Sequence, residues 1–362
     1  MSDLDIVRKE IEEIDKSMAA LFVKRMEAAG KVAEYKMKVG LPVKDETREK
    51  QLIEKNMAYI ESDEYKPYYS DFMKDVIGIS CRYQDKRMNG IKIAYAGKEG
   101  AFSHIACGKF FKEGVTVSYP GFKEAYDAVE NGEVDFAVLP IENSYAGEVG
   151  EVMDLMFSGN LFINKVIDME ITQNLVAKKN VSMDEIKKVI SHPQALHQCA
   201  EYIDTKHWET MEMPSTSDAA GYVAESDDKT LAAIASIDAA EKYGLNVLDR
   251  NINDSGVNTT RFALFSSVRN STVTKKKRIG ECFSLVFTVS NQPGALTQAL
   301  NILGVHDFNM RCLRSRPMKN LQWNYYFYLE AEGDINSENG QDMLRELNAV
   351  CDKLRLVGFY QY

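Results

Sequence analysis

An amphipathic run near the N-terminus places the strongest limit on how this chain can fold. Apolar residues recur with a heptad period between residues 3 and about 39, which predicts a single helix. A helix of about 36 residues would be about 54 Å long. The two shorter helical patterns that follow, near residues 46–60 and 66–86, cannot cover that length. We therefore expect the long helix to pair with a second copy of the chain.

Arg25 stands in this apolar stripe at a position where the heptad period predicts an apolar residue. Burying a guanidinium without a partner is costly, so an acidic residue of a paired helix or a bound anion must lie opposite it. Lys36 follows 11 residues later, within about 20° around the helix and about 16 Å along it, so both side chains can reach one anion. Arg8 precedes Arg25 by 17 residues, or about 25 Å, and can reach the same anion only from a partner chain.

The composition argues against several classes of function. The 362 residues carry a net charge of -10 with a sequence pI of about 5.2, whereas a nucleic-acid-binding protein normally has a basic face. The six cysteines form no CxxC pair, so we expect neither a zinc cluster nor a disulfide framework. The N-terminus has no apolar signal sequence, and no stretch of about 18 apolar residues occurs. We expect a cytoplasmic protein that binds neither nucleic acid nor membrane.

The pattern changes twice along the chain, which predicts a multidomain protein. Residues 1–88 are expected to form an all-helical domain. Between residues 90 and 270, short apolar strands alternate with helical patterns, and two such α/β blocks predict two lobes with a cleft between them. A polar, basic linker is predicted near residues 271–280. Residues 280–362 have the order βαββαβ, which predicts an α+β ferredoxin-like domain.

The cationic helical segment resembles the all-helical chorismate mutases. The resemblance covers "VRKEIEEIDKSMAALFVKRMEAAGKVAEYKMKVGLPVKDETREKQLIE" and the later stretch "SCRYQ" at 80–84. It implies that chorismate, a dicarboxylate, is held in a folded conformer while negative charge on the breaking ether oxygen is stabilised. Lys36 and Gln84 are implied beside that oxygen as the catalytic residues. The implied chorismate-binding residues are Arg8, Arg25, Lys36, Asp45, Arg48, Glu49, Ser80 and Gln84.

Three of these positions have other interpretations. Asp45 precedes the helix predicted to start near Glu46, so it is equally suited to be the N-cap of that helix. Ser80 neighbours Cys81, and a shift of one residue in the third helix would exchange their positions. A single arginine such as Arg25 in a helical seam also pairs with a glutamate in coiled coils, where it sets only the register.

Polar stretches in the α/β domain stand where its strands end, which is the edge at which open α/β sheets bind ligands. The stretches "PIENS" (140–144), "SHPQ" (191–194), "STS" (215–217) and "NTTRF" (258–262) occur in this order, after a glycine turn in "AGKEGAFSH". Together they resemble the prephenate dehydratases. The resemblance implies a two-lobed fold similar to periplasmic binding proteins. It also implies a reaction that expels carbon dioxide and hydroxide from prephenate and gives phenylpyruvate.

The same resemblance implies roles for particular residues. Thr260 is the implied hydrogen-bond donor to the leaving hydroxyl, and Glu142 is an alternative catalytic proton source. Arg261 is the implied cation for a substrate carboxylate. His192 precedes a proline at a helix start, so we expect a structural role for it rather than an acid role. The implied prephenate-binding residues are Asn143, Ser144, Ser191, Gln194, Thr260, Arg261 and Phe262.

The C-terminal segment resembles the regulatory ACT domains of the same enzymes through "NQPGALTQAL" at 291–300 and "LRSRP" at 313–317. The resemblance implies that these stretches bind phenylalanine between paired domains. Arg314 departs from the family, which usually has a glutamate there, so we expect an altered affinity for phenylalanine. Gly294 is also suited to a turn that starts a helix. The implied effector-binding residues are Gly294, Ala295, Leu296, Ser315 and Arg316.

The sequence therefore predicts a bifunctional enzyme that converts chorismate to prephenate and prephenate to phenylpyruvate. We expect phenylalanine as a feedback inhibitor, no cofactor or metal, and a homodimer or higher homo-oligomer. Two other functions are a dehydratase whose helical segment only dimerises and a non-catalytic sensor of aromatic compounds. The full set of cations argues against the first, and "NTTRF" together with "PIENS" argues against the second.

Overall fold

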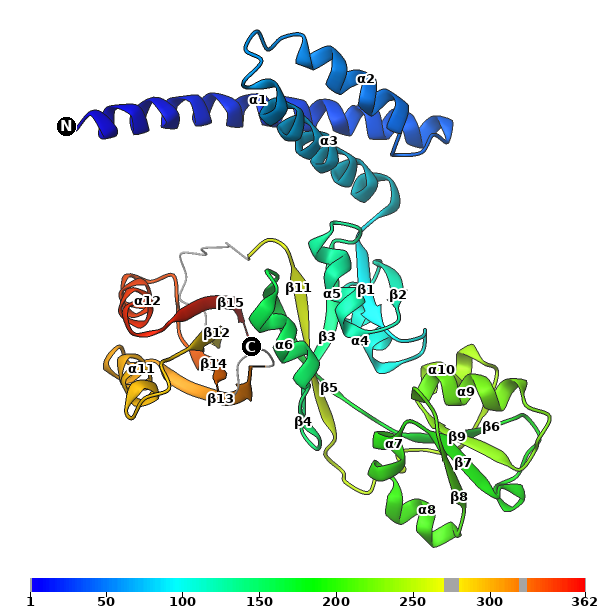
Figure 1. The fold of residues 1–362 in the computed structure, drawn as a ribbon. Helices are drawn as coiled ribbons and strands as arrows, with labels where there is room; N and C mark the ends of the chain where they lie inside the picture. Colours follow the sequence, from blue (N-terminus) through cyan, green and yellow to red (C-terminus); the bar gives the residue numbers. More distant parts are fainter. Residues whose placement is uncertain (1, 270–279, 319–323, 362) are drawn as a thin grey trace. The chain divides into compact units, whose positions relative to one another are not determined.

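The computed structural model divides into two compact units, Met1–Lys92 and Ile93–Tyr362 (Figure 1). The linker predicted near residues 271–280 lies outside the described part of the chain except for Gly280. The residues that the structure describes are 2–269, 280–318 and 324–361.

The N-terminal unit consists of three helices, and its first helix has the predicted extent. This helix, α1, begins with a capping box between Ser2 and Asp5 and ends at Gly40, which has a left-handed conformation with φ of 70°. The second half of α1 packs on α3 through small residues such as Ala29 and Ala33, which are buried. The bounds are α1 Asp3–Val39, α2 Glu46–Met57 and α3 Lys66–Asn89.

The first half of α1 is not covered by the other helices of its unit (Figure 1). Its apolar stripe is exposed to solvent, with Leu4 at 57% and Leu21 at 64% exposure. Solvent-exposed apolar stripes of this length are typical of helices that pack against a partner. Other members of the exposed stripe are Val7, Ile11, Ile14 and Met18.

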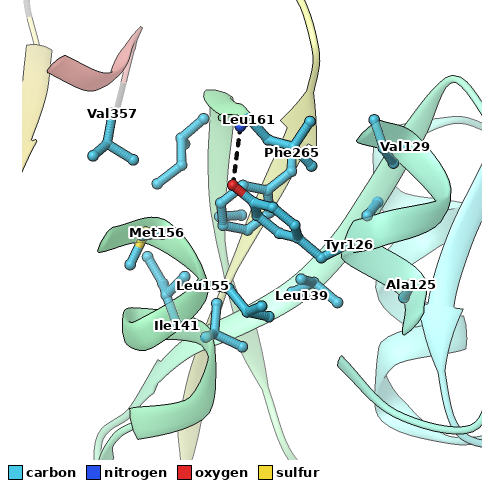
Figure 2. Close-up of a cluster of buried hydrophobic side chains, with 14 of the residues drawn as sticks. Ala125, Tyr126, Val129, Leu139, Ile141, Leu155, Met156, Leu161, Phe265 and Val357 are labelled. Atoms are coloured by element: carbon cyan, nitrogen blue, oxygen red, sulfur yellow. Dashed lines mark hydrogen bonds between the residues drawn. The ribbon is translucent and has the colours of Figure 1, made fainter. Parts of the chain in front are cut away.

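The first lobe of the second unit is a mixed sheet covered by helices. Strand β11, which carries "NTTRF", lies antiparallel to β3, which carries "PIENS". Tyr126 of α5 packs edge-on against Phe265 of β11 at 5.7 Å, and its hydroxyl accepts a hydrogen bond from Leu161 N at 2.9 Å (Figure 2). These contacts between α5 and β11 fix the position of β11 in the sheet. The bounds are β1 Lys92–Ala96, α4 Phe102–Phe110, β2 Val115–Tyr119, α5 Phe122–Glu130, β3 Phe136–Asn143, β4 Gly147–Glu148, α6 Gly150–Ser158, β5 Phe162–Glu170 and β11 Thr259–Ser266.

The second lobe is a separate sheet in the order β10-β6-β9-β7-β8. The chain enters it from β5 and returns through β11, so the unit has two lobes, as predicted. Every residue of β9 is buried, as expected for a central strand that is covered on both faces. The bounds are β6 Asn174–Ala177, η1 Met183–Glu185, β7 Lys188–Ser191, α7 Pro193–Gln198, α8 Ala200–Lys206, β8 Glu209–Glu212, α9 Thr216–Glu225, β9 Leu231–Ala235, α10 Ile237–Lys242 and β10 Asn246–Asp249.

The C-terminal segment has the element order βαββαβ, with its strands side by side in the order β13-β14-β12-β15. Strand β15 also pairs with β5 of the first lobe, where Gly358 lies opposite Ile163, so one sheet continues through both. A Cβ atom on Gly358 would lie 2.8 Å from the carbonyl oxygen of Ile163, so this close approach requires glycine. The bounds are β12 Glu281–Thr288, α11 Ala295–Val305, β13 Asn309–Pro317, β14 Tyr325–Glu332, α12 Glu338–Val350 and β15 Lys353–Gln361.

Among the described helices, none is long and apolar enough to cross a membrane. Each of the six cysteines is a free thiol. No group of three or more metal-ligating side chains occurs within the described residues.

Candidate active sites

Arg25 lies against α3 of its own chain, and its described hydrogen-bond partners are neutral. Its Nη1 donates to the carbonyl oxygen of Val76 at 3.1 Å and to the hydroxyl of Ser80. The side chain is half-buried, and this burial lowers the pKa of the guanidinium. A carbonyl and a hydroxyl do not compensate the positive charge. The position therefore favours a bound anion.

Gln84 lies one turn after Ser80 on α3 and presents an amide to the interior of the helical unit. It is 7% exposed, and its Oε1 has no hydrogen-bond partner among the described residues. A buried polar atom without a partner costs about 1–3 kcal/mol, so such a group calls for an explanation. A ligand bound in this region would explain why this amide oxygen has no protein partner in the described part of the chain. Ser80, and not the neighbouring Cys81, is the residue that contacts Arg25.

Lys36 of α1 and Glu49 of α2 lie in the same part of the helical unit. Lys36 Nζ donates to the carbonyl of Val43, and Glu49 Oε1 accepts a hydrogen bond from the Cys81 thiol at 3.5 Å. Burial raises the pKa of Cys81 first of all, Glu49 raises it further, and Lys36 lowers it. The two charged side chains therefore lie close enough to act on one thiol.

Three other predicted mutase residues stand apart from this group. Asp45 accepts a hydrogen bond from Arg48 N at 3.0 Å and is the N-cap of α2, which agrees with its structural interpretation. The side chain of Arg48 is exposed. Arg8 is exposed as well and lies on the same unbroken helix as Arg25, so one chain does not bring these two arginines together.

A cleft of about 560 Å³ lies between the two lobes of the second unit. Of the predicted dehydratase residues, four line it, together with residues from the glycine turn after β1. Asn143 and Thr260 are direct cross-strand partners on its floor, and Asn143 Nδ2 also donates to Asn258 Oδ1 at 2.9 Å. The predicted residues that line the cleft are Asn143, Gln194, Thr260 and Phe262.

Helix N-termini surround this cleft. The first residues of α4, α5 and α9 line it, and so do the N-cap residues of α6 and α7. Helices α4, α5 and α6 begin at Ala101, Gly121 and Val149 without a capping side chain, which leaves the first-turn amides available to a ligand. No lysine or arginine is among the described residues that line the cleft. Two glutamates, Glu148 and Glu151, line it, so any attraction for an anion must come from backbone amides and helix dipoles.

Arg261 and Glu142 do not line the cleft, contrary to the roles expected for them. They lie opposite each other on β11 and β3, next to Thr260 and Asn143, and strand alternation turns them to the other face of the sheet. Arg261 Nη1 lies 3.7 Å from Glu142 Oε2 and 3.5 Å from Glu330 Oε2 of the C-terminal segment. This geometry does not support contact of either residue with prephenate.

Two predicted serines have structural roles in this arrangement. Ser191 is fully buried, and its hydroxyl donates to the carbonyl of Ile234 at 2.7 Å. Ser144 is exposed and accepts a hydrogen bond from Thr259 N at 3.0 Å. His192 is the N-cap of α7, since its Nδ1 accepts from Gln194 N, which agrees with the structural role expected for it.

Two buried glutamines were missed by the sequence analysis. Gln173 and Gln198 line the cleft, and Gln198 Oε1 accepts hydrogen bonds from Gln173 Nε2 at 3.3 Å and from Asn258 Nδ2 at 3.0 Å. The Oε1 of Gln173 is buried without a partner among the described residues. Neither glutamine lies in a recognisable motif. Their only signal is a polar residue within an otherwise apolar pattern.

The predicted effector residues lie on two elements of the C-terminal segment. Gly294 is exposed, has φ of 86° and is the N-cap of α11, while Ala295 and Leu296 are half-buried in its first turn. Ser315 of β13 is exposed. Arg316 Nε donates to Asp154 Oδ1 of the first lobe at 3.1 Å, so this arginine already has an ionic partner.

Family comparisons match both parts of the chain. A model described as chorismate mutase type II matches residues 7–85, and one described as prephenate dehydratase matches residues 93–270. Among solved structures, a prephenate dehydratase from Arthrobacter aurescens in complex with L-Phe is 27% identical, covers 75% of this chain and 90% of its own, and has a TM-score of 0.68. A structure described as GqqA, a novel type of quorum quenching acylase, is 30% identical, covers 75% of this chain and 97% of its own, and has the same TM-score.

A curated relative extends the similarity over nearly the full length. The bifunctional chorismate mutase/prephenate dehydratase of Buchnera aphidicola from Schizaphis graminum is 31% identical over 99% of this chain and 96% of its own. The two family segments and the near-complete coverage show the same domain content in this chain and in the relative. The chain belongs to the family of bifunctional chorismate mutase/prephenate dehydratases.

Proposed function

We propose that this chain performs its two reactions at the two sites described above, with chorismate bound in the helical unit and prephenate in the cleft of the α/β unit. The observation that carries the proposal is the different chemistry of the two sites. The helical unit offers side-chain cations, including the uncompensated Arg25. The cleft offers amides, hydroxyls and helix N-termini.

The mutase site is complete only in a dimer. Arg8 is 17 residues from Arg25 on one straight helix, a separation of about 25 Å, so the Arg8 that meets the substrate comes from a second chain. The exposed apolar stripe in the first half of α1 supports this, because pairing with a second α1 would bury it. The proposed assembly is at least a homodimer.

Chorismate rearranges without a proton donor or a nucleophile, so the protein lowers the barrier by confinement and electrostatics. Arg8, Arg25 and Arg48 hold the two carboxylates of the folded conformer. Lys36 and the amide of Gln84 face the ether oxygen, where negative charge develops as the bond breaks. Glu49 accepts a hydrogen bond from the substrate hydroxyl. Gln84 donates at every pH because its amide does not titrate.

In the cleft, Thr260 is the proposed donor to the leaving hydroxyl of prephenate. Its oxygen accepts from Asn143 Nδ2 at 2.9 Å, which leaves its own hydrogen free for donation. The carboxylate that is lost departs as carbon dioxide, its electron pair enters the ring, and the hydroxyl departs as hydroxide, which then takes a proton from solvent to form water. The ring becomes aromatic, which drives the reaction. Both steps are favoured where water is excluded from the carboxylate.

The carboxylates of prephenate are recognised by helix N-termini rather than by Arg261. The uncapped first turns of α4, α5 and α6 supply amide donors, and their dipoles favour a negative charge. This replaces the role expected for Arg261 from the sequence.

The C-terminal segment is proposed to be an ACT domain that binds phenylalanine at Gly294 and Ser315. The strand order β13-β14-β12-β15 and the sequence motifs on α11 and β13 support this assignment. A prephenate dehydratase of similar fold was solved in complex with L-Phe. Kinetic assays of purified protein with chorismate and with prephenate as separate substrates test the proposal, since each site predicts its own product.

A further inference from the structure

Two neighbouring cross-strand pairs on β3 and β11 face opposite sides of one sheet. Asn143 and Thr260 face the cleft, whereas Glu142 and Arg261 face the C-terminal segment. Each residue of the rear pair is bonded directly to a residue of the front pair through the backbone. A displacement of the rear pair therefore moves the Thr260 hydroxyl, and catalytic hydrogen bonds are sensitive to displacements of about 1 Å.

The rear pair is held by ionic contacts from two strands of the C-terminal segment. Arg314 Nη2 of β13 donates to Glu142 Oε1. Glu330 of β14 lies 3.5 Å from Arg261 Nη1. Glu142 and Arg261 are also 3.7 Å apart, so the four side chains form one alternating chain of charges. Arg261 is 17% exposed, which makes these contacts less screened than surface ion pairs.

Glu330 fixes one end of this chain of charges. Its side chain is 1% exposed, and its Oε2 accepts a hydrogen bond from the Tyr360 hydroxyl at 2.7 Å. At the other end, Arg314 Nε lies 3.4 Å from Glu148 Oε2, and Glu148 itself lines the cleft. Arg314 therefore contacts one residue behind the catalytic strand and one residue on the cleft wall.

We propose that Arg314 is a positioning residue for the dehydratase reaction. It holds Glu142 and thereby fixes the strand segment that carries Asn143, which in turn orients the Thr260 hydroxyl. The C-terminal segment thus contributes to dehydratase catalysis when no effector is bound. This inference rests on the proposed assignment of Asn143 and Thr260 to the dehydratase site. It also gives Glu142 a positioning role in place of the acid role expected from the sequence.

A double-mutant cycle with Arg314→Gln and Glu142→Gln tests the coupling. We expect each single change to lower dehydratase kcat by about tenfold or more, with KM changed by less than about threefold, because the group acts on orientation and not on binding. The loss in the double variant should be clearly smaller than the product of the two single losses, since both changes remove the contact between Arg314 and Glu142. Arg314→Lys should recover part of the activity, because it keeps the charge.

The same chain provides the controls. Mutase activity, measured on the same samples, should remain unchanged and shows that equal amounts of the chain are compared. Arg345→Gln removes an arginine that is 77% exposed and bonds Asp342 one turn away, and it should leave both activities unchanged. Losses that multiply in the double variant would overturn the inference, because they would mean that Glu142 acts independently of Arg314.

The outcome for Arg314 is separable from the outcome for the site itself. If Thr260→Val keeps full dehydratase activity, the assignment of the site is wrong. If Thr260→Val is inactive but Arg314→Gln stays within about twofold of the parent, only the positioning role is wrong, since twofold is well below the effect of a lost transition-state contact.

Discussion

Asn143 and Thr260 lie opposite each other on β3 and β11, and the amide of Asn143 donates to the Thr260 hydroxyl at 2.9 Å. The amide oxygen of Asn143 is fixed at the same time by the backbone N–H groups of Tyr145 and Ala146, at 3.0 Å and 2.9 Å. The amide therefore has one orientation, and its nitrogen faces Thr260. In the proposed mechanism this relationship orients the Thr260 hydroxyl as a donor before the substrate arrives, an arrangement that favours catalysis.

A shared mutase site predicts complementation between inactive variants. Arg8→Ala and Arg25→Ala should each be inactive, because each removes a carboxylate contact from both sites of a homodimer. After subunit exchange, a mixed dimer contains one site that has both arginines. We expect mutase activity to reappear at up to about a quarter of the parent rate, from half of the dimers with one intact site each. Proven exchange, followed by mass spectrometry, without recovered activity would exclude a site shared between chains.

Replacing Gln84 with glutamate should make the mutase dependent on acid. An ionised carboxylate beside the ether oxygen repels the developing negative charge, whereas a protonated one donates a hydrogen bond as the amide does. We expect the rate of Gln84→Glu at neutral pH to fall by about a hundredfold, as for a loss of about 3 kcal/mol, and to rise as the pH is lowered. The parent should show no such rise. Dehydratase activity of the same variant serves as the control.

His192 should make the stability of the α/β unit depend on pH. Burial lowers the pKa of His192 below its usual value of about 6.5, and Glu212 opposes this shift in part. Between the two pKa values the unfolded chain binds more protons than the folded one, so the free energy of unfolding falls as pH drops through about 6.5. His192→Asn keeps an acceptor at the N-cap but does not titrate. It should therefore lose less stability between about pH 7.5 and 5.5 than the parent.

Urea unfolding followed by Trp208 fluorescence measures this difference. Trp208 packs against Tyr202 in the second lobe, with ring centroids 6.0 Å apart, and a Trp323→Phe background removes the other tryptophan signal. Equal losses of stability in the His192→Asn variant and its parent would mean that His192 titrates alike in the folded and unfolded chain.

Phenylalanine should bind the C-terminal segment and inhibit the dehydratase, although Arg314 departs from the family motif. Gly294 and Ser315 are exposed and accessible to a small ligand. Calorimetric titration should give a heat of binding, and prephenate assays should show inhibition. Neither signal at millimolar phenylalanine would mean that the segment does not bind this amino acid. Arg314→Glu would place a carboxylate beside Glu142 and Glu148, so we expect it to impair the dehydratase.

Much of the fold was predictable because each part has its own periodicity. The heptad period and the break at Gly40 and Pro42 defined α1, and strand-helix alternation defined the two lobes. The pairing of β15 with β5 was not predictable, because it depends on a single close approach at Gly358 that leaves no pattern in the sequence. Sheets that continue from one domain into another are set by tertiary packing and not by local propensity.

Sequence motifs predicted which residue types form the candidate sites, but not which way each side chain points. The motifs located Thr260 and Asn143 correctly at the cleft, but they gave the same weight to Arg261 and Glu142. Alternation along a strand sends neighbours to opposite faces, so adjacent motif residues have different surroundings. The proposed role of the N-termini of α5 and α6 could not be predicted, because backbone amides there carry no sequence signature.

The central claim is that the two reactions take place at two separate active sites, and paired single variants test it most directly. Chorismate and prephenate are supplied separately to Arg25→Ala and to Thr260→Val, and both products are quantified. The account predicts that Arg25→Ala loses mutase activity by about a hundredfold or more and keeps dehydratase activity, and that Thr260→Val does the reverse. Mutase activity of Arg25→Ala within about tenfold of the parent, or loss of both activities in either folded variant, would contradict the account.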